Sequence, residues 1–192
     1  METTYQAIFT RIGKLIQAAA LFALVLVGCQ PSQPASGDKQ PFIVTSAAFQ
    51  DGEQIPGIYT EANHSIPFAW DHAPKETKSF ALFIVDLHPV ANMWVHWVVV
   101  NIPATVHSIP EGASLTDKLP EGSKELMNSS GQTGYFPPAP PAGSGNHEYK
   151  IHVYALDVET LDTPLFVSYE QFQELAKDHV IDSAEISGYF EN

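Results

Sequence analysis

The feature that most limits the fold of this chain is a set of short apolar runs separated by turns rich in proline and glycine. The runs are rich in valine, isoleucine and aromatic residues, which favour β-strands. They are 42-FIVTSAAF-49, 79-SFALFIVD-86, 95-VHWVVVNI-102 and 149-YKIHVYAL-156. Short strands with proline and glycine turns between them predict a mainly β domain rather than a helical bundle.

One helix is predicted late in the chain, in the run 169-YEQFQELAKDH-179. Ser168, followed three residues later by Gln171, forms the pattern of a capping box at its start. The expected apolar stripe consists of Phe172, Leu175 and Ala176. Because no internal repeat or change of composition divides residues 42–192, the sequence predicts a single domain there.

A histidine lies inside one of the apolar runs, at position 96. Regular strand alternation predicts two faces, with Val95, Trp97 and Val99 on one and His96, Val98 and Val100 on the other. Such a residue is either a core histidine whose ring nitrogen pairs with a carbonyl, or a polar group at the bottom of a pocket. The run alone leaves both interpretations open.

The amino terminus is typical of a signal peptide covering residues 1–28. Arg11 and Lys14 precede 15-LIQAAALFALVLV-27, which has the length of a signal-peptide hydrophobic region and is short for a membrane span. Cys29, the only cysteine in the sequence, follows Gly28 directly. This junction resembles the lipobox of bacterial lipoproteins, which implies cleavage before Cys29 and diacylation of its sulfur. An ordinary secretory signal or an uncleaved anchor is the alternative.

Residues 29–41 are predicted to form a flexible, lipid-anchored tether, because 30-QPSQPASGDKQ-40 contains no large apolar side chain. The expected location is therefore the bacterial cell envelope, with the membrane as a partner through the anchor. Gln30 after the cysteine resembles the sorting pattern for an outer membrane where the cell has two. The formal net charge of −13 argues against nucleic acid as a partner.

Several motifs occur in a characteristic order along the domain: 67-PFAW-70, 79-SFALFIVD-86, 96-HWVVVNIPA-104, 134-GYFPPAPPAGSGNHEY-149, 153-VYALD-157 and 188-GY-189. Together they resemble the phosphatidylethanolamine-binding protein family, in its bacterial Raf kinase inhibitor-like group. The resemblance covers nearly all of residues 42–192. It implies a two-sheet antiparallel β-sandwich with a few peripheral helices and a small anion-binding pocket at one end.

The resemblance also implies which residues bind the ligand. Asp86 matches the family's acidic segment, His96 the strand histidine, Pro138 the proline-rich loop, and His147 and Tyr149 the histidine–x–tyrosine that follows. Two imidazoles and a phenol can donate hydrogen bonds to phosphate or carboxylate oxygens. An ionised Asp86 cannot donate, so we expect it to orient one of the two histidines.

The sequence departs from the family pattern at three positions near the expected pocket. His88 replaces a second aspartate, Pro137 lacks the N–H of a glycine, and Glu148 replaces an arginine. Asp86, His88, His96 and His147 also form a conceivable metal set, although no tight histidine spacing supports it. We predict no metal and no cofactor.

The leading functional hypothesis is a lipid-anchored extracytoplasmic protein that binds a small anionic or zwitterionic ligand, such as a phosphorylated headgroup. The alternative is an interaction module that inhibits a protease or kinase, or binds another envelope protein. An enzyme is not expected from the motifs. The run 142-AGSGN-146 fails the Gly-x-Ser-x-Gly pattern at both glycine positions.

Overall fold

The computed structural model describes residues 40–61 and 64–192. The predicted signal peptide and nearly all of the predicted tether therefore lie outside the described residues. The segment Lys39–Asn192 forms one compact unit. Within the described ranges, no helix is both long enough and apolar enough to cross a membrane.

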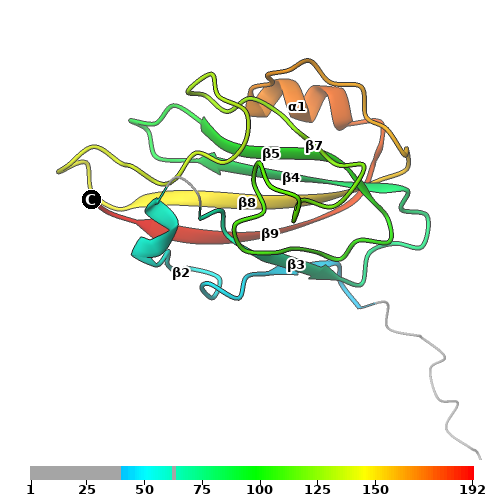
Figure 1. The fold of residues 1–192 in the computed structure, drawn as a ribbon, viewed down its shortest axis with the longest axis horizontal. Coiled ribbons are helices and arrows are strands. Elements are labelled where there is room, and N and C mark those ends of the chain that lie inside the picture. Colours follow the sequence, from blue (N-terminus) through cyan, green and yellow to red (C-terminus); the bar gives the residue numbers. More distant parts are fainter. Residues whose placement is uncertain (1–39, 62–63) are drawn as a thin grey trace, which may run out of the picture. The chain divides into compact units, whose positions relative to one another are not determined.

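In the described part of the chain, two β-sheets and one α-helix make up the domain (Figure 1). The larger sheet has the order β2 (Glu53–Gln54), β9 (Val180–Phe190), β8 (His147–Leu156), β4 (Ser79–Asp86), β5 (Trp94–Pro103) and β7 (Lys124–Glu125). The smaller sheet has the order β1 (Ile43–Thr45), β3 (Phe68–Asp71) and β6 (Ser108–Ile109). The pairing is antiparallel, apart from β2, which runs parallel to β9. The prediction of a mainly β, two-sheet architecture is confirmed.

The larger sheet is covered on both faces, so it carries two hydrophobic clusters. One cluster lies against the smaller sheet and includes Trp70, Phe80 and Trp97. The other lies against helix α1 (Tyr169–Ala176) and includes Phe83 and Phe172, whose ring centroids are 5.1 Å apart. Double coverage explains why every residue of β4 is buried and why its sequence is an unbroken apolar run.

Helix α1 begins as the sequence predicts but presents a narrower apolar stripe. Ser168 Oγ accepts a hydrogen bond from the Gln171 N–H (3.2 Å), and the Gln171 side chain accepts one from the Ser168 N–H (3.0 Å). Phe172 and Ala176 are buried, whereas Leu175 is 41% exposed. The inclusion of Leu175 in the stripe was wrong, because at 100° per residue it lies roughly 90° from the buried centre of the helix.

Some strands follow the predicted runs closely and others do not. Strands β4, β5 and β8 match 79–86, 95–102 and 149–156 to within two residues at each end. The run 42–49 is a strand only over Ile43–Thr45. Strand β9 was not predicted, because polar residues alternate through its first half and leave no apolar run.

The predicted faces of β5 are wrong at its start. Ile84 pairs with Trp97 and Val85 pairs with Val95, so His96 has no Cα partner on β4. Such a bulge puts two residues opposite one and breaks the alternation of faces. As a result, Val95 joins the helix-side cluster, whereas His96 contacts the layer between the sheets. The register with the neighbouring strand therefore decides where this histidine points.

Gly188 of β9 gives a test of the packing between the strands and the loop that precedes η1 (Gly57–Thr60). A Cβ atom at this position would lie 2.7 Å from Ile55 Cγ1 and 2.8 Å from Phe49 Cε2. We expect Gly188→Ala to lower the free energy of unfolding by about 1–3 kcal/mol, the usual cost of overpacking a core. Urea unfolding followed by tryptophan fluorescence measures this value.

The matched control is Gly57→Ala, since a Cβ atom there meets nothing within 4 Å. It should leave stability unchanged or raise it by a few tenths of a kcal/mol through the unfolded chain. Equal stabilities of the two variants would contradict the close packing around Gly188.

Candidate functional site

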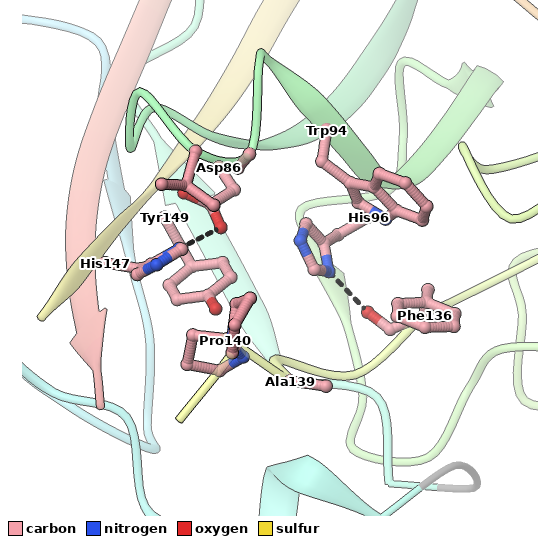
Figure 2. A pocket seen from close by; sticks show the side chains of 11 residues that line it. Asp86, Trp94, His96, Phe136, Ala139, Pro140, His147 and Tyr149 are labelled. Carbon is pink, nitrogen blue, oxygen red and sulfur yellow. Dashed lines mark hydrogen bonds and ion pairs between the residues drawn. The ribbon is translucent and has the colours of Figure 1, made fainter. Parts of the chain in front are cut away.

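A cavity of about 310 Å³ opens where three central strands of the larger sheet meet. Strand β4 ends there, whereas β5 and β8 begin there, because antiparallel pairing places Asp86 opposite both Trp94 and Tyr149. The loop that follows Tyr135 closes the remaining side. The lining residues are Asp86, Val90, Ala91, Trp94, His96, Phe136, Ala139, Pro140, Pro141, His147 and Tyr149 (Figure 2).

Four of the five residues assigned by resemblance line this cavity: Asp86, His96, His147 and Tyr149. Pro138 does not. It lines a smaller void that His96 and Tyr149 also border, on the side of Ile66 and Tyr135. The structure thus brings four predicted residues together at the cavity and places Pro138 at the neighbouring void.

His96 is held at both its backbone and its side chain by Phe136. The His96 carbonyl accepts a hydrogen bond from the Phe136 N–H (2.8 Å), and the His96 ring Nδ1–H donates to the Phe136 carbonyl (2.8 Å). Because a carbonyl can only accept, Nδ1 carries the proton. Burial lowers the pKa of His96 to about 4, against smaller opposing contributions from the Phe136 carbonyl and Asp86.

The role of His96 therefore differs from the predicted donor. At neutral pH the ring is uncharged, so its Nε2 carries a lone pair and accepts hydrogen bonds. Figure 2 shows the rings of His96 and Tyr149 pointing toward the same space. The two interpretations left open by the sequence both hold in part, since one nitrogen pairs with a carbonyl and the residue still lines a cavity.

Tyr149 and Trp94 line the cavity, and each side chain carries a hydrogen-bond donor. The Tyr149 hydroxyl and the Trp94 Nε1–H are buried and have no partner within the described part of the chain. Burial raises the pKa of Tyr149, and the Asp86 carboxylate raises it further, so the hydroxyl keeps its proton. A buried donor without a partner costs about 1–3 kcal/mol, which a ligand oxygen would recover.

His147 is buried and both of its ring nitrogens are engaged. Its Nδ1–H donates to Asp86 Oδ2 (2.6 Å), and its Nε2 lies 2.9 Å from Ser144 Oγ. Asp86 Oδ1 accepts the His88 N–H (2.9 Å). Asp86 orients His147 rather than His96, which settles the choice that the sequence left open. A ligand reaches His147 Nε2 only if Ser144 moves aside.

Two of the three residues that depart from the family pattern, His88 and Glu148, do not line the cavity. The His88 ring stacks on the His147 ring, with centroids 3.9 Å apart. Glu148 accepts a hydrogen bond from Ser187 (2.7 Å) and lies 3.5 Å from Lys150 Nζ. Neither residue lines the cavity. Within the described ranges, no group of three or more histidine, cysteine, aspartate or glutamate residues could hold a metal ion.

Sequence reasoning missed several lining residues, of which Trp94 is the most informative. It lies two positions before His96, so strand alternation near the pocket histidine could have indicated it. Phe136 was also missed. Its carbonyl fixes His96, and no sequence pattern shows such a contact, because it joins residues 40 positions apart.

Comparison with known proteins places this geometry in a family. The family profile described as "Phosphatidylethanolamine-binding protein" matches residues 45–191. A UPF0098 protein of Methanothermobacter thermautotrophicus is 39% identical over 145 residues, which cover 74% of this chain and 94% of that protein. The chain belongs to the phosphatidylethanolamine-binding protein family.

A solved structure and a second relative are also similar to this chain. The crystal structure of Escherichia coli YbcL, described as a member of the mammalian PEBP family, superposes with a TM-score of 0.73 at 33% identity, covering 80% of this chain and 99% of that one. The putative lipoprotein LppC of Mycobacterium tuberculosis is 32% identical over 140 residues, or 72% of this chain and 67% of that protein.

The protonation of His96 can be tested directly by ¹⁵N NMR of the imidazole nitrogens across pH. We expect Nδ1 to be protonated and Nε2 unprotonated near neutral pH, with a midpoint near 4. Because the unfolded chain binds this proton more readily, stability should also fall as pH decreases from 6.5 toward 4. A proton on Nε2 near neutral pH, or a midpoint at or above 6.5, would contradict this assignment.

Proposed function

We propose that this chain is a binding protein whose cavity takes a small anion or phosphorylated headgroup, presented outside the cytoplasm on a lipid anchor. The observation that carries the ligand proposal is the Tyr149 hydroxyl, which has no partner among the described residues, beside the uncharged His96 ring. The cavity of about 310 Å³ lies at the small end of the range for ligand pockets. Its size suits a compact group of a few heavy atoms.

The donors and the acceptor select the chemistry of the ligand. Tyr149 and Trp94 each offer one hydrogen to ligand oxygens, whereas His96 Nε2 offers a lone pair. A fully ionised group satisfies the donors but faces the lone pair of His96. A group that also carries an O–H satisfies all three, and a phosphate monoester does so in its monoanionic form.

Binding should therefore be linked to the uptake of one proton. The proton resides either on the ligand oxygen that faces His96 or on His96 itself. Both arrangements contain the same number of protons. In either case affinity falls as pH rises above the second pKa of a phosphate monoester, which is about 6.

The carboxylates of Asp86, which lines the cavity, and of the nearby Glu148 already have partners. Asp86 is occupied by His147 and the His88 N–H, and Glu148 is held by Ser187 and Lys150. These carboxylates are therefore less available to an ammonium group of a ligand. The rings of Trp94 and Phe136 line the cavity and offer aromatic faces to a cationic group instead.

Calorimetric titration with phosphate, acetate and phosphoethanolamine tests the ligand proposal. We expect Tyr149→Phe to weaken phosphate binding by about 1.5–3 kcal/mol, the usual value of a hydrogen bond to a charged group. His96→Ala should weaken it and should also abolish the rise in affinity between about pH 8 and about pH 5.5.

Tyr154→Phe is the control, because it removes a tyrosine hydroxyl from the helix-side cluster of the same sheet. It should bind phosphate like the wild type. Wild-type binding in Tyr149→Phe, or no binding of any of the three compounds, would refute the proposed pocket.

The lipid anchor rests on the sequence before Gln40 and on one relative. Cys29 follows a signal-like run and small residues. A relative at 32% identity carries the name putative lipoprotein LppC. A domain tethered through Cys29 would present its cavity near a membrane surface, where phosphorylated headgroups are concentrated.

The anchor predicts how the protein fractionates in a bacterial cell. The wild type should partition with membranes and release lipid-modified peptides beginning at Cys29, since two or more acyl chains anchor stably. Cys29→Ser should leave it unprocessed or soluble. Mass spectrometry that shows an unmodified mature amino terminus would overturn this proposal.

A further inference from the structure

A serine, a histidine and an aspartate form a continuous chain beside the cavity. Ser144 Oγ lies 2.9 Å from His147 Nε2, and His147 Nδ1 lies 2.6 Å from Asp86 Oδ2. The residues therefore use the same atoms, in the same order, as the triads of serine hydrolases. Such triads are identified by geometry rather than by sequence position, so the absence of a Gly-x-Ser-x-Gly motif does not exclude one.

Asp86 and His147 are held in place by burial and by hydrogen bonds. Asp86 is 3% exposed and His147 is 1% exposed. Asp86 Oδ1 accepts the His88 N–H, which leaves Oδ2 for His147. The stacked His88 ring restricts the His147 ring from one face. A buried carboxylate that fixes the tautomer and orientation of an imidazole is what general-base catalysis requires.

The serine lies in a sharply turning loop at the edge of the cavity. Gly143 and Gly145 on either side have φ angles of +78° and +87°, a conformation that other residues adopt only with strain. Ser144 is half-buried, and its N–H donates to the Pro141 carbonyl (3.1 Å). The loop therefore keeps the hydroxyl of a partly exposed serine within reach of His147.

The hydrogen bonds of Ser144 show where the protons lie in the Ser144–His147–Asp86 group. The Ser144 hydroxyl also donates to the Pro141 carbonyl (2.6 Å), so its oxygen is left to accept from His147 Nε2–H. This arrangement places a proton on both nitrogens of His147. The reactive form needs the Nε2 proton to leave and the hydroxyl to turn from Pro141 toward His147.

We propose that Ser144 is a nucleophile activated by His147 and Asp86, which acts on small uncharged carboxylic esters. Ser144 Oγ bonds to the ester carbonyl carbon while its proton passes to His147 Nε2. The C–O bond to the alcohol then breaks, and His147 returns the proton to the leaving alcohol. Water attacks the acyl group, gives a proton to His147, and Ser144 leaves and recovers that proton, so ester and water become acid and alcohol.

Two further observations define the substrate. The Gly145 N–H directly follows the nucleophile, the position of an oxyanion donor, and it forms no backbone hydrogen bond within the described part of the chain. The formal net charge of −13 disfavours anionic esters at long range. Short acyl chains are expected because Ser144 is only partly exposed.

A fluorophosphonate probe tests the nucleophile without requiring turnover. Ser144 Oγ would bond to phosphorus as fluoride leaves, and His147 would carry the serine proton to solvent. We expect one covalent adduct, mapped to Ser144 by peptide mass spectrometry, and hydrolysis of p-nitrophenyl acetate above the rate of the buffer. Ser144→Ala should abolish both signals.

Ser183→Ala is the matched control, since Ser183 is exposed on β9 and its hydroxyl contacts no histidine in the described residues. It should react like the wild type. An adduct on any residue other than Ser144, or a labelling rate that Ser144→Ala leaves unchanged, would overturn the proposal.

The dependence on the base is tested with Asp86→Asn. We expect the labelling rate to fall by about 100-fold or more, the usual contribution of general-base catalysis. Far-ultraviolet circular dichroism and the unfolding midpoint confirm that the variant is folded. If it does not fold, the pH profile of the wild type decides, because a rate that depends on a general base rises with pH.

The groups that face His147 and set this profile are Asp86, His88, His96 and Tyr149. A labelling rate independent of pH would overturn the role of His147 as the base.

Discussion

The burial of β4 on both faces is the constraint on which the rest of the structure depends. A strand covered by a second sheet on one side and by α1 on the other has no solvent to satisfy its polar groups. Its residues are apolar from Phe80 to Val85, and the first ionisable group comes where the strand ends, at Asp86. The cavity lies at this end, where Asp86 lines it. Antiparallel pairing then brings the starts of β5 and β8 to the same place.

Asp86 determines why two buried histidines at one cavity differ in chemistry. Its two oxygens are taken by the His88 N–H and the His147 ring, so His96 receives no direct carboxylate partner. Desolvation then dominates at His96 and lowers its pKa to about 4, which leaves an uncharged acceptor. His147 instead belongs to a buried pair. Removing one partner of such a pair typically costs about 3–5 kcal/mol, because the other is left without compensation.

The sequence predicted the strands that show a local apolar pattern. It did not predict features that depend on contacts between distant parts of the chain. Strand β4 was predicted because burial on both faces requires a continuous apolar run. Strand β8 was predicted because apolar residues recur along it between polar ones. Strand β9 was not predicted, because polar side chains interrupt its apolar positions. The face of His96 was mispredicted, since the bulge depends on the register with β4. Family resemblance placed Tyr149 and His147 at the cavity, but not Ser144, whose significance depends on a distance rather than on a motif.

The proposed ligand site and the proposed nucleophile meet at His147, which lines the cavity and whose Nε2 contacts Ser144. In the structure this nitrogen is occupied by Ser144, so the cavity offers an anion Tyr149, Trp94 and His96 first. A ligand held by those three groups leaves the hydrogen bonds among Ser144, His147 and Asp86 intact. A ligand that also takes His147 Nε2 must displace Ser144 and so removes the base from its nucleophile. The two activities are therefore independent only if the ligand stops short of His147. The effect of bound phosphate on Ser144 reactivity would reveal how deeply the anion lies, because competition requires contact with that single nitrogen.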